Sequence, residues 1–272
     1  MGMKVTAARA ALHFWEEPCI SGSEGSGAVF FSGCPMGCVF CQNAEISGKR
    51  AGREISVQRL AEIFLELQDR KANNINLVTA VHYIPSVAAA LRLAKENGLH
   101  IPAVYNSSGY ESVRSLKMLE GLVDIWLPDF KYMDPGPAAL YSRCRDYPDR
   151  AKEALAEMVR QAGPPDFDER GVMRRGVIVR HLVLPGLTGN AKKVIRYLHD
   201  TYGKDIFISI LNQYTPVPGV EERYPELGRQ VSEAEYERVL TFAERIGVEN
   251  GYRQEGGAVG ESFIPAFDGK GI

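Results

Sequence analysis

Three of the five cysteines lie within eight residues, at Cys34, Cys38 and Cys41, in the order Cys-x-x-x-Cys-x-x-Cys. Three thiolates this close together can hold three corners of a cubane iron–sulfur cluster, and the fourth iron is then left without a local protein ligand. An iron with an open position can bind and activate a second molecule, whereas an electron carrier usually has four cysteine ligands. The spacing therefore predicts a 4Fe–4S cluster with one open iron site.

The residues around the cysteines favour the same interpretation. A short apolar strand at residues 28–31 precedes them, and Gly33 and Gly37 lie among them. Glycine lets the backbone bend tightly and approach a bulky inorganic group without a Cβ atom in the way. Phe40 places an aromatic ring beside the last sulfur.

Two other uses of these cysteines need to be considered. A structural zinc site takes four ligands, usually as two pairs, but Cys19 and Cys144 are isolated in the sequence. A disulfide framework would normally use an even number of cysteines behind a secretory signal, and neither is present. Zinc is therefore the main alternative, and with it a non-catalytic metal-binding or electron-transfer protein.

The stretch Cys-x-x-x-Cys-x-Phe-Cys after the first strand resembles the signature of radical S-adenosylmethionine (SAM) enzymes. The resemblance implies that Cys34, Cys38 and Cys41 hold a 4Fe–4S cluster whose open iron chelates SAM. It also implies that an electron from the cluster cleaves SAM to methionine and a 5′-deoxyadenosyl radical, which abstracts hydrogen from a substrate. The cofactors would carry the chemistry, and the protein would position them and exclude water.

The resemblance covers about residues 5 to 255 and is closest to uncharacterised proteins similar to pyruvate formate-lyase activating enzymes. Residues 73–79, 128–132 and 180–186 carry this closer match. It implies an activase that takes hydrogen from a glycyl residue of a partner enzyme, so a protein substrate is expected. The alternative is a radical SAM enzyme that acts on a small molecule or on another peptide site. The resemblance also implies flavodoxin or ferredoxin as the electron donor.

The composition excludes several function classes. With 45% apolar and 24% charged residues, the chain is typical of a soluble globular protein. The net charge of −2 gives no indication of a nucleic-acid or anionic-membrane partner. No apolar run approaches the roughly 20 residues of a membrane-spanning helix, and no signal peptide is apparent. We therefore expect a cytoplasmic protein with no nucleic-acid or membrane partner.

Apolar periodicity predicts alternating strands and helices. Strands are expected at residues 28–31, 75–79, 101–105, 123–127, 177–184 and 206–211. Helices are expected at residues 55–70, 85–97, 111–119, 149–161, 191–202 and 232–246. Ser86 and Ser232 are the expected N-caps of two of these helices, and Glu235 completes a capping box with Ser232.

This alternation predicts an α/β fold with a parallel sheet and crossover helices. Six units are too few for an eightfold barrel, and the resemblance implies a partial (β/α)6 TIM-type barrel of parallel strands. Residues 4–15 would add a short N-terminal strand or hairpin. We expect one radical SAM domain over residues 1–272, with a core at about 26–215 and a C-terminal helical extension at 216–272.

Polar residues follow several strands, where parallel barrels bind their ligands. Where related enzymes carry a Gly-Gly-Glu motif for the SAM amino group, this chain has Thr79 and His82. Asn106 and Ser107 end the third strand and are similar to a segment near the SAM carboxylate in the activating enzymes. Asp129 and Lys131 follow the fourth strand, where the activating enzymes have an Asp-x-Lys contact to SAM. An aspartate and a lysine at such a place are costly to bury unless they are paired or ligand-bound, and we favour ligand binding.

The fifth strand contains Arg180 and His181, which must point to opposite faces, so only one of them can face the site. The sequence leaves open which one does. His13 and Trp15 are expected to serve in packing rather than in chemistry. The residues expected to contact SAM are therefore Phe40, Gln42, Asn43, Thr79, His82, Asn106, Ser107, Asp129, Lys131, Arg180 and Gln213.

Overall fold

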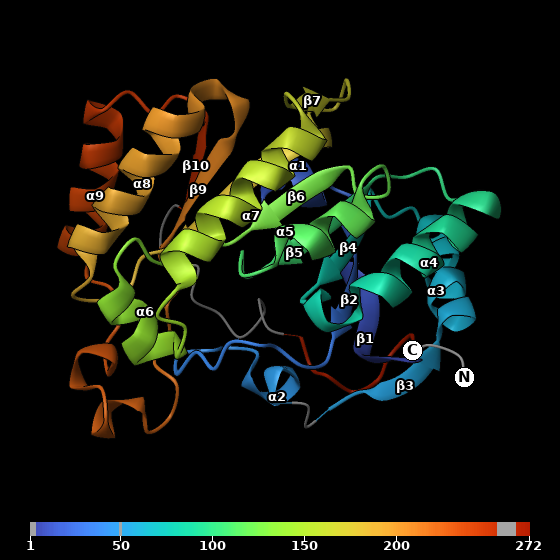
Figure 1. The fold of residues 1–272 in the computed structure, drawn as a ribbon, viewed down its shortest axis with the longest axis horizontal. Coiled ribbons are helices and arrows are strands. Elements are labelled where there is room, and N and C mark those ends of the chain that lie inside the picture. Colours follow the sequence, from blue (N-terminus) through green and yellow to red (C-terminus); the bar gives the residue numbers. More distant parts are fainter. Residues whose placement is uncertain (1–3, 49–50, 255–264) are drawn as a thin grey trace.

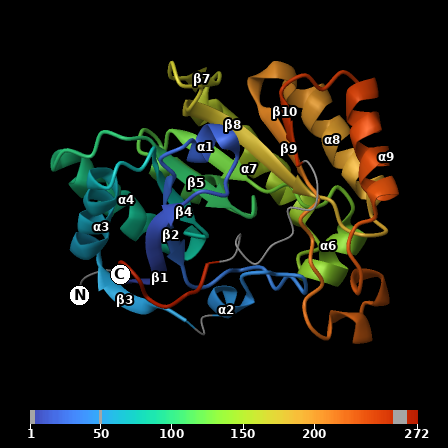
Figure 2. The ribbon, with the colours of Figure 1, turned by 180° about the vertical axis from the view of Figure 1, so that it is seen from behind.

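The fold is a single mostly parallel sheet whose outer side is covered by helices (Figures 1 and 2). It is seen in a computed structural model, which describes residues 4–48, 51–254 and 265–272. The strands are β1 (Lys4–His13), β2 (Ser26–Phe31), β3 (Arg53–Ser56), β4 (Ile75–Val78), β5 (Ala103–Ser107), β6 (Ile125–Pro128), β7 (Asp166–Phe167), β8 (Met173–Leu182), β9 (Phe207–Leu211) and β10 (Gly251–Arg253). The helices are α1 (Pro18–Ser21), α2 (Ala44–Ser47), α3 (Val57–Asp69), α4 (Ile84–Glu96), α5 (Val113–Leu116), α6 (Pro135–Ser142), α7 (Tyr147–Ala162), α8 (Thr188–Tyr202) and α9 (Glu233–Arg245).

The strand order confirms the predicted α/β architecture. Strands β2, β4, β5, β6, β8 and β9 are parallel neighbours in sequence order and correspond to the six predicted strands. The short strand β10 adds a further parallel neighbour to β9, so the C-terminal extension is not purely helical. The predicted N-terminal strand is β1, which pairs antiparallel with β2 and with β3. The sheet is open, because β3 and β10 end it without pairing to each other.

Three helix predictions need correction. Helix α4 begins at Ile84 with Tyr83 as its N-cap, so the assignment of Ser86 as the cap was wrong. The segment predicted as one helix at residues 111–119 is instead the short α5 followed by a 3-10 turn, Lys117–Leu119. Helix α6 was missed because Pro135-Gly136-Pro137 resembles a chain break, although proline is tolerated in a first helical turn. The capping box of Ser232 and Glu235 is confirmed at the start of α9.

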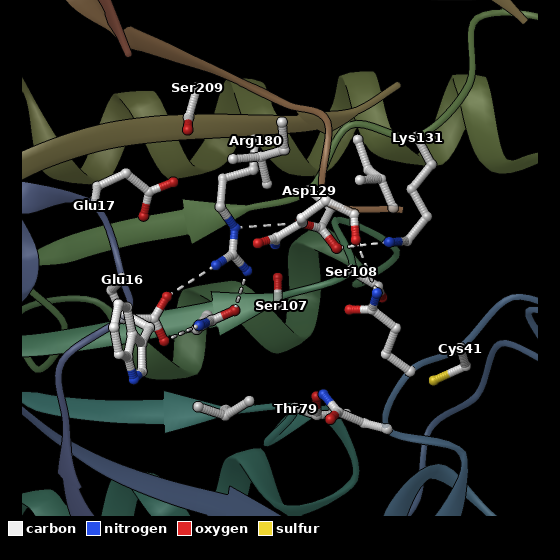
Figure 3. A pocket seen from close by; sticks show the side chains of 18 of the residues that line it. Glu16, Glu17, Cys41, Thr79, Ser107, Ser108, Asp129, Lys131, Arg180 and Ser209 are labelled. Carbon is white, nitrogen blue, oxygen red and sulfur yellow. Dashed lines mark hydrogen bonds and ion pairs between the residues drawn. The ribbon is translucent and has the colours of Figure 1, made fainter. Parts of the chain in front are cut away.

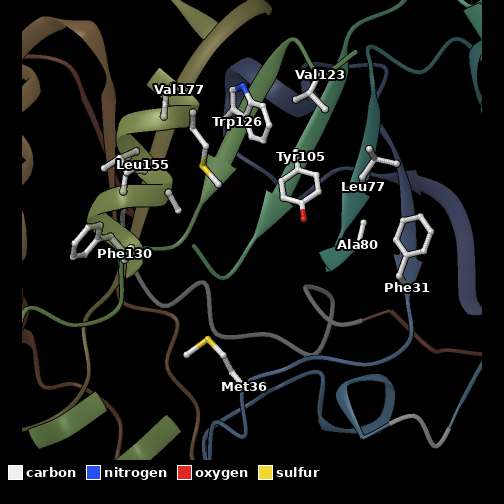
Figure 4. Packing of buried hydrophobic residues seen from close by; sticks show 14 of the residues in the cluster. Phe31, Met36, Leu77, Ala80, Tyr105, Val123, Trp126, Phe130, Leu155 and Val177 are labelled. Atoms are coloured by element: carbon white, nitrogen blue, oxygen red, sulfur yellow. The ribbon is translucent and has the colours of Figure 1, made fainter. Parts of the chain in front are cut away.

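The two faces of the strands have different roles. Leu77, Tyr105 and Trp126 point outward and pack against the helices (Figure 4). The residues that alternate with them point inward, and Val104, Ile125 and Ile178 form a smaller apolar cluster with the α1 residues Cys19 and Ile20. Val104 and Ile125 lie in the amino-terminal halves of their strands, and Ile178 lies near the middle of β8. Helix α1 therefore fills the interior near the amino ends of the strands. The space near their carboxyl ends remains for polar side chains.

Helix α1 is fixed in this position by two buried asparagines, Asn73 and Asn74, that directly precede β4. The Asn74 side chain donates to the Ile20 carbonyl over 2.8 Å, and the Asn73 side chain donates to the Ser21 carbonyl over 2.7 Å. Because Glu16 and Glu17 directly precede α1, these bonds also hold both carboxyl groups at the inner face of the sheet. The sequence gives no sign of this, since the contacts join residues about fifty positions apart.

Candidate active site

A cavity of about 550 Å³ lies inside the curved sheet, toward the carboxyl ends of its parallel strands (Figure 3). This volume is within the usual range for sites that bind small molecules and cofactors. Cys34, Cys38 and Cys41 line it. Of the eleven residues predicted to contact SAM, ten also line it: Phe40, Gln42, Asn43, Thr79, Asn106, Ser107, Asp129, Lys131, Arg180 and Gln213.

The three cysteines form one end of the cavity, which we call the sulfur end. They lie on the loop between β2 and α2, and each is partly buried. Gly33, just before the first cysteine, has a φ of 99°, a conformation that favours glycine, whereas Gly37 has no such backbone. Burial raises the pKa of the Cys34 thiol to about 12 and also raises that of Cys38.

The surroundings of the sulfurs suit thiolate ligands. The Ser142 hydroxyl donates to Cys38 Sγ over 3.0 Å, and the positive charge of Lys131 counteracts the raised pKa of both Cys34 and Cys38. Among the described residues, no three His, Cys, Asp or Glu side chains converge as a single metal ion would require. A cubane cluster needs no such convergence, because each sulfur binds a different iron. The donor set therefore fits the cluster that the sequence predicts.

Two glutamines join the cysteine loop to the end of β9. The Gln42 side chain donates to the Gln213 carbonyl over 3.0 Å, although these residues are far apart in the sequence. Phe40 is buried and meets Tyr214 edge to face, with 6.5 Å between ring centroids. These contacts fix the wall beside Asn43, another of the residues expected to contact SAM.

Strand alternation explains which residue of β8 faces the cavity. Arg180 has the same orientation as the inward Ile178 and lines the cavity, whereas His181 is buried on the outer face. The His181 Nδ1 lies 2.7 Å from the Phe130 carbonyl, and burial lowers the pKa of this histidine to about 4. The alternative that the sequence left open is thus decided in favour of Arg180.

Arg180 is the centre of a polar network in the middle of the cavity. Its Nη1 lies 3.0 Å from Glu16 Oε2, and its Nε lies 3.3 Å from Asp129 Oδ1. Lys131 Nζ lies 2.6 Å from the other Asp129 oxygen. Asp129 is thus already paired within the protein, whereas the sequence favoured ligand binding over pairing. Burial alone would raise the pKa of Asp129, but Lys131 and Arg180 outweigh it and hold that pKa below its usual value.

The end of β4 differs from the prediction at one residue. Thr79 lines the cavity, and its φ of 61° is a left-handed conformation that a β-branched residue rarely adopts. At the place where related enzymes have the Gly-Gly-Glu motif, Thr79 therefore has a backbone conformation that glycine adopts most easily. After this turn, residues 81–83 form a 3-10 turn that carries His82 to the exposed side of the sheet, against the Tyr83 ring. His82 is thus the one predicted SAM contact that does not line the cavity.

The second end of the cavity, which we call the carboxylate end, was not predicted from the sequence. It comprises Glu16 and Glu17, with Ser209 of β9 beside them (Figure 3). Glu16 accepts a hydrogen bond from Asn76 over 2.9 Å in addition to its contact with Arg180. His13 and Trp15 line the cavity too, which was not expected of packing residues. Two adjacent glutamates before a short helix were the available signal, but the sequence does not reveal that α1 turns them inward.

Glu111 is a buried acid behind this cavity, and it should make stability depend on pH. It is 2% exposed, accepts from the Ser107 hydroxyl over 3.1 Å, and burial raises its pKa from 4.5 to about 7. A raised pKa favours folding below the unfolded-state pKa, and this contribution is lost as the pH rises to the folded-state pKa. For Glu111 the loss between these two pKa values amounts to about 3 kcal/mol.

The variant Glu111→Gln should remove this pH dependence. We expect its free energy of unfolding, relative to wild type, to rise by about 3 kcal/mol between pH 4.5 and pH 7. Urea unfolding at several pH values measures this difference, and the exposed Glu237→Gln is the matched control. A difference that stays constant with pH would show that Glu111 is not the titrating group.

Comparison with known sequences identifies the family. The sequence profile of the Radical SAM superfamily matches residues 28–198, which include all three cysteines and most of the cavity wall. The chain belongs to the radical SAM superfamily. The predicted family is therefore confirmed, and with it the general chemistry in which SAM is cleaved to generate a radical. The protein is also 27% identical over 246 residues to the uncharacterized protein MJ0674 of Methanocaldococcus jannaschii, a match that covers 88% of this chain and 67% of the relative.

Two solved structures share the fold. SuiB from Streptococcus suis, in a crystal structure with bound S-adenosylmethionine, superposes with a TM-score of 0.58 and 12% identity over 86% of this chain. Methylornithine synthase (PylB) superposes with a TM-score of 0.52 and 13% identity over 78% of this chain. The match covers 50% of SuiB and 59% of PylB, so this chain spans only about half of those proteins. These likenesses confirm the partial barrel.

None of the helices in the described part of the chain has the length and apolar character needed to cross a membrane.

Proposed function

We propose that this protein is a radical SAM enzyme that takes hydrogen from a substrate held in the cavity between its two ends. The observation that supports this most strongly is the meeting of Cys34, Cys38 and Cys41 with ten predicted SAM contacts around one cavity. When bound, the 4Fe–4S cluster supplies one electron that splits SAM into methionine and a 5′-deoxyadenosyl radical, which becomes 5′-deoxyadenosine when it takes a substrate hydrogen atom.

The protein's own residues have separate tasks in this proposal. Cys34, Cys38 and Cys41 bind the cluster, and Ser142 stabilises the Cys38 thiolate through its hydrogen bond. Gln42, with its side chain fixed on the Gln213 carbonyl, orients the adenine side together with Asn43. Asp129, Lys131 and Asn106 bind the ribose and methionine groups, which would replace part of the ion pairing between Asp129 and Lys131. Flavodoxin or ferredoxin is the proposed electron donor.

The substrate class is the open part of the proposal. An activase-like enzyme would receive a glycyl residue of a partner protein, whose backbone brings no charge into the cavity. The carboxylate end, with Glu16 and Glu17 next to Arg180, favours a charged or strongly polar substrate. We therefore place a small molecule or another peptide site ahead of a partner's glycine.

The proposed chemistry is tested by one assay. The protein is reconstituted anaerobically with iron and sulfide, reduced with dithionite and incubated with SAM. We expect 5′-deoxyadenosine and methionine to form in equal amounts, because one SAM yields one of each. SAM that is recovered unchanged with a reduced cluster present, or a colourless protein that retains zinc, would contradict the proposal.

A further inference from the structure

Glu17 is a buried carboxyl group that faces the cavity and leaves one oxygen unused. Its side chain is 7% exposed and lines the cavity, and its Oε2 has no hydrogen-bond partner among the described residues. Figure 3 shows its carboxyl group between Ser209 and Glu16, at the side of the cavity away from Cys41. A buried polar atom without a partner costs free energy, so such an atom in a cavity wall indicates a place for a ligand.

The neighbouring charges are already balanced without Glu17. Arg180 pairs with Glu16 at 3.0 Å and with Asp129 at 3.3 Å, while Lys131 pairs with Asp129 at 2.6 Å. These are two cations and two carboxylates. An ionised Glu17 therefore adds one uncompensated negative charge, which a positively charged ligand group would neutralise.

A proton can take the place of that ligand when the cavity holds no substrate. Burial raises the pKa of Glu17, Arg180 counteracts this rise, and Glu16 adds to it. Cys19 and Tyr252 also face Glu17, and burial raises their own pKa values, so both stay neutral and add no charge beside it. In the protein without substrate, Glu17 can therefore stay protonated, and burial of the neutral carboxyl group costs little free energy.

We propose that Glu17 binds a cationic nitrogen of the substrate, an inference that rests on the proposed function and names the substrate class of its cavity. The nitrogen would be an ammonium group, either of a free amine or of a lysine side chain in a peptide. Phe14 and Trp15 also line the cavity and are 50% and 52% exposed, so they offer aromatic surface to the alkyl part of such a ligand. With its nitrogen at Glu17, the ligand's remaining atoms extend toward the sulfur end.

The test uses the reconstituted holoprotein with SAM bound and three probes of equal length, n-butylammonium, 1-butanol and butyrate. Calorimetry measures their dissociation constants. We expect n-butylammonium to bind about tenfold to a hundredfold more tightly than 1-butanol, because it forms a charge-assisted hydrogen bond, and butyrate to bind most weakly. Equal binding of the three probes, or a preference for butyrate, would overturn the inference.

Two variants assign the preference to Glu17. Glu17→Gln keeps the size of the side chain and removes its charge, so the preference for n-butylammonium over 1-butanol should disappear. Glu24→Gln, an acid from the neighbouring loop that pairs with Arg170 at 3.5 Å outside the cavity, should keep it. A preference that survives in Glu17→Gln would place the amine elsewhere and overturn the inference.

A further probe distinguishes the source of the nitrogen. The blocked peptide acetyl-Gly-Lys-Gly-amide carries the same ammonium group on a peptide chain. Tighter binding than n-butylammonium indicates a lysine side chain of a peptide, and weaker binding indicates a free amine. SAM cleavage is measured on the same wild-type preparation: if it is absent, the proposed function fails, whereas loss of amine preference with SAM cleavage intact defeats only the inference about Glu17.

Discussion

Replacement of Cys38 by alanine should reduce formation of 5′-deoxyadenosine from SAM by more than about a hundredfold. Loss of a group that only supports a metal ligand commonly costs about 10–100-fold, and loss of the ligand itself should cost more. Cys38 is partly buried, lines the cavity and accepts the Ser142 hydrogen bond, and its removal leaves the loop with two cysteines for the cluster. The assay is the anaerobic reaction with dithionite, with deoxyadenosine quantified by chromatography.

The matched control is Cys144→Ala. Cys144 is also buried and lies close enough to Cys38 to influence the pKa of that thiol, but it does not line the cavity. We expect this variant to keep its iron and to retain activity close to wild type. Equal loss of activity in both variants would mean that the effect comes from a damaged fold and not from a missing cluster ligand.

Replacement of Arg180 by methionine should lower the free energy of unfolding by about 3–5 kcal/mol, as is typical when one member of a buried ion pair is removed. The guanidinium of Arg180 pairs with Glu16 and Asp129, whose side chains are 8% and 28% exposed. Methionine keeps the bulk of the side chain but leaves both carboxylates with less compensation. Urea unfolding near neutral pH measures the loss.

The pH dependence of this loss has a definite sign. In wild type, Lys131 and Arg180 overcome the effect of burial and hold the pKa of Asp129 below 3.8, which contributes stability that is lost only as the pH falls through that lowered value. Without Arg180, only Lys131 still opposes the effect of burial, so the pKa of Asp129 is higher than in wild type and the carboxylate becomes protonated at a higher pH. The deficit should therefore shrink as the pH is lowered toward about 4.

The control for Arg180 is Lys193→Met. Lys193 pairs with Asp134 at 2.8 Å on the surface, where its side chain is 59% exposed, and such pairs contribute less than about 1 kcal/mol. A loss for Arg180→Met no larger than the loss for Lys193→Met would show that the network in the cavity does not stabilise the fold.

Local sequence patterns were sufficient for most of the fold. The parallel strands were predictable because buried strands of this sheet are short apolar runs between helices with a clear 3.6-residue period, and the helix at Ser232 carries its own capping box. Short elements were not predictable in the same way. Strand β10 has three residues, and helix α6 begins with two prolines, so neither presents a periodic pattern.

The sulfur end of the cavity was predictable for a similar reason, since the cysteines and the residues after each strand are fixed by local spacing. The carboxylate end was not, because Glu16 and Glu17 are held in the interior by long-range contacts of helix α1, among them the bonds from Asn73 and Asn74. The left-handed turn at Thr79 redirects the chain, so that His82 lies outside the cavity. A threonine in the sequence does not indicate such a turn. Long-range contacts and rare backbone conformations thus could not be predicted from the local pattern of residues.

The most direct test of the central claim is electron paramagnetic resonance of the reconstituted, dithionite-reduced protein before and after SAM is added. A cluster on Cys34, Cys38 and Cys41 has one iron without a protein ligand, so SAM should bind there and change the signal of the reduced cluster. The account predicts a 4Fe–4S signal that shifts with SAM and is absent in Cys38→Ala. A cluster signal that SAM leaves unchanged, or a protein that binds no iron, would contradict it.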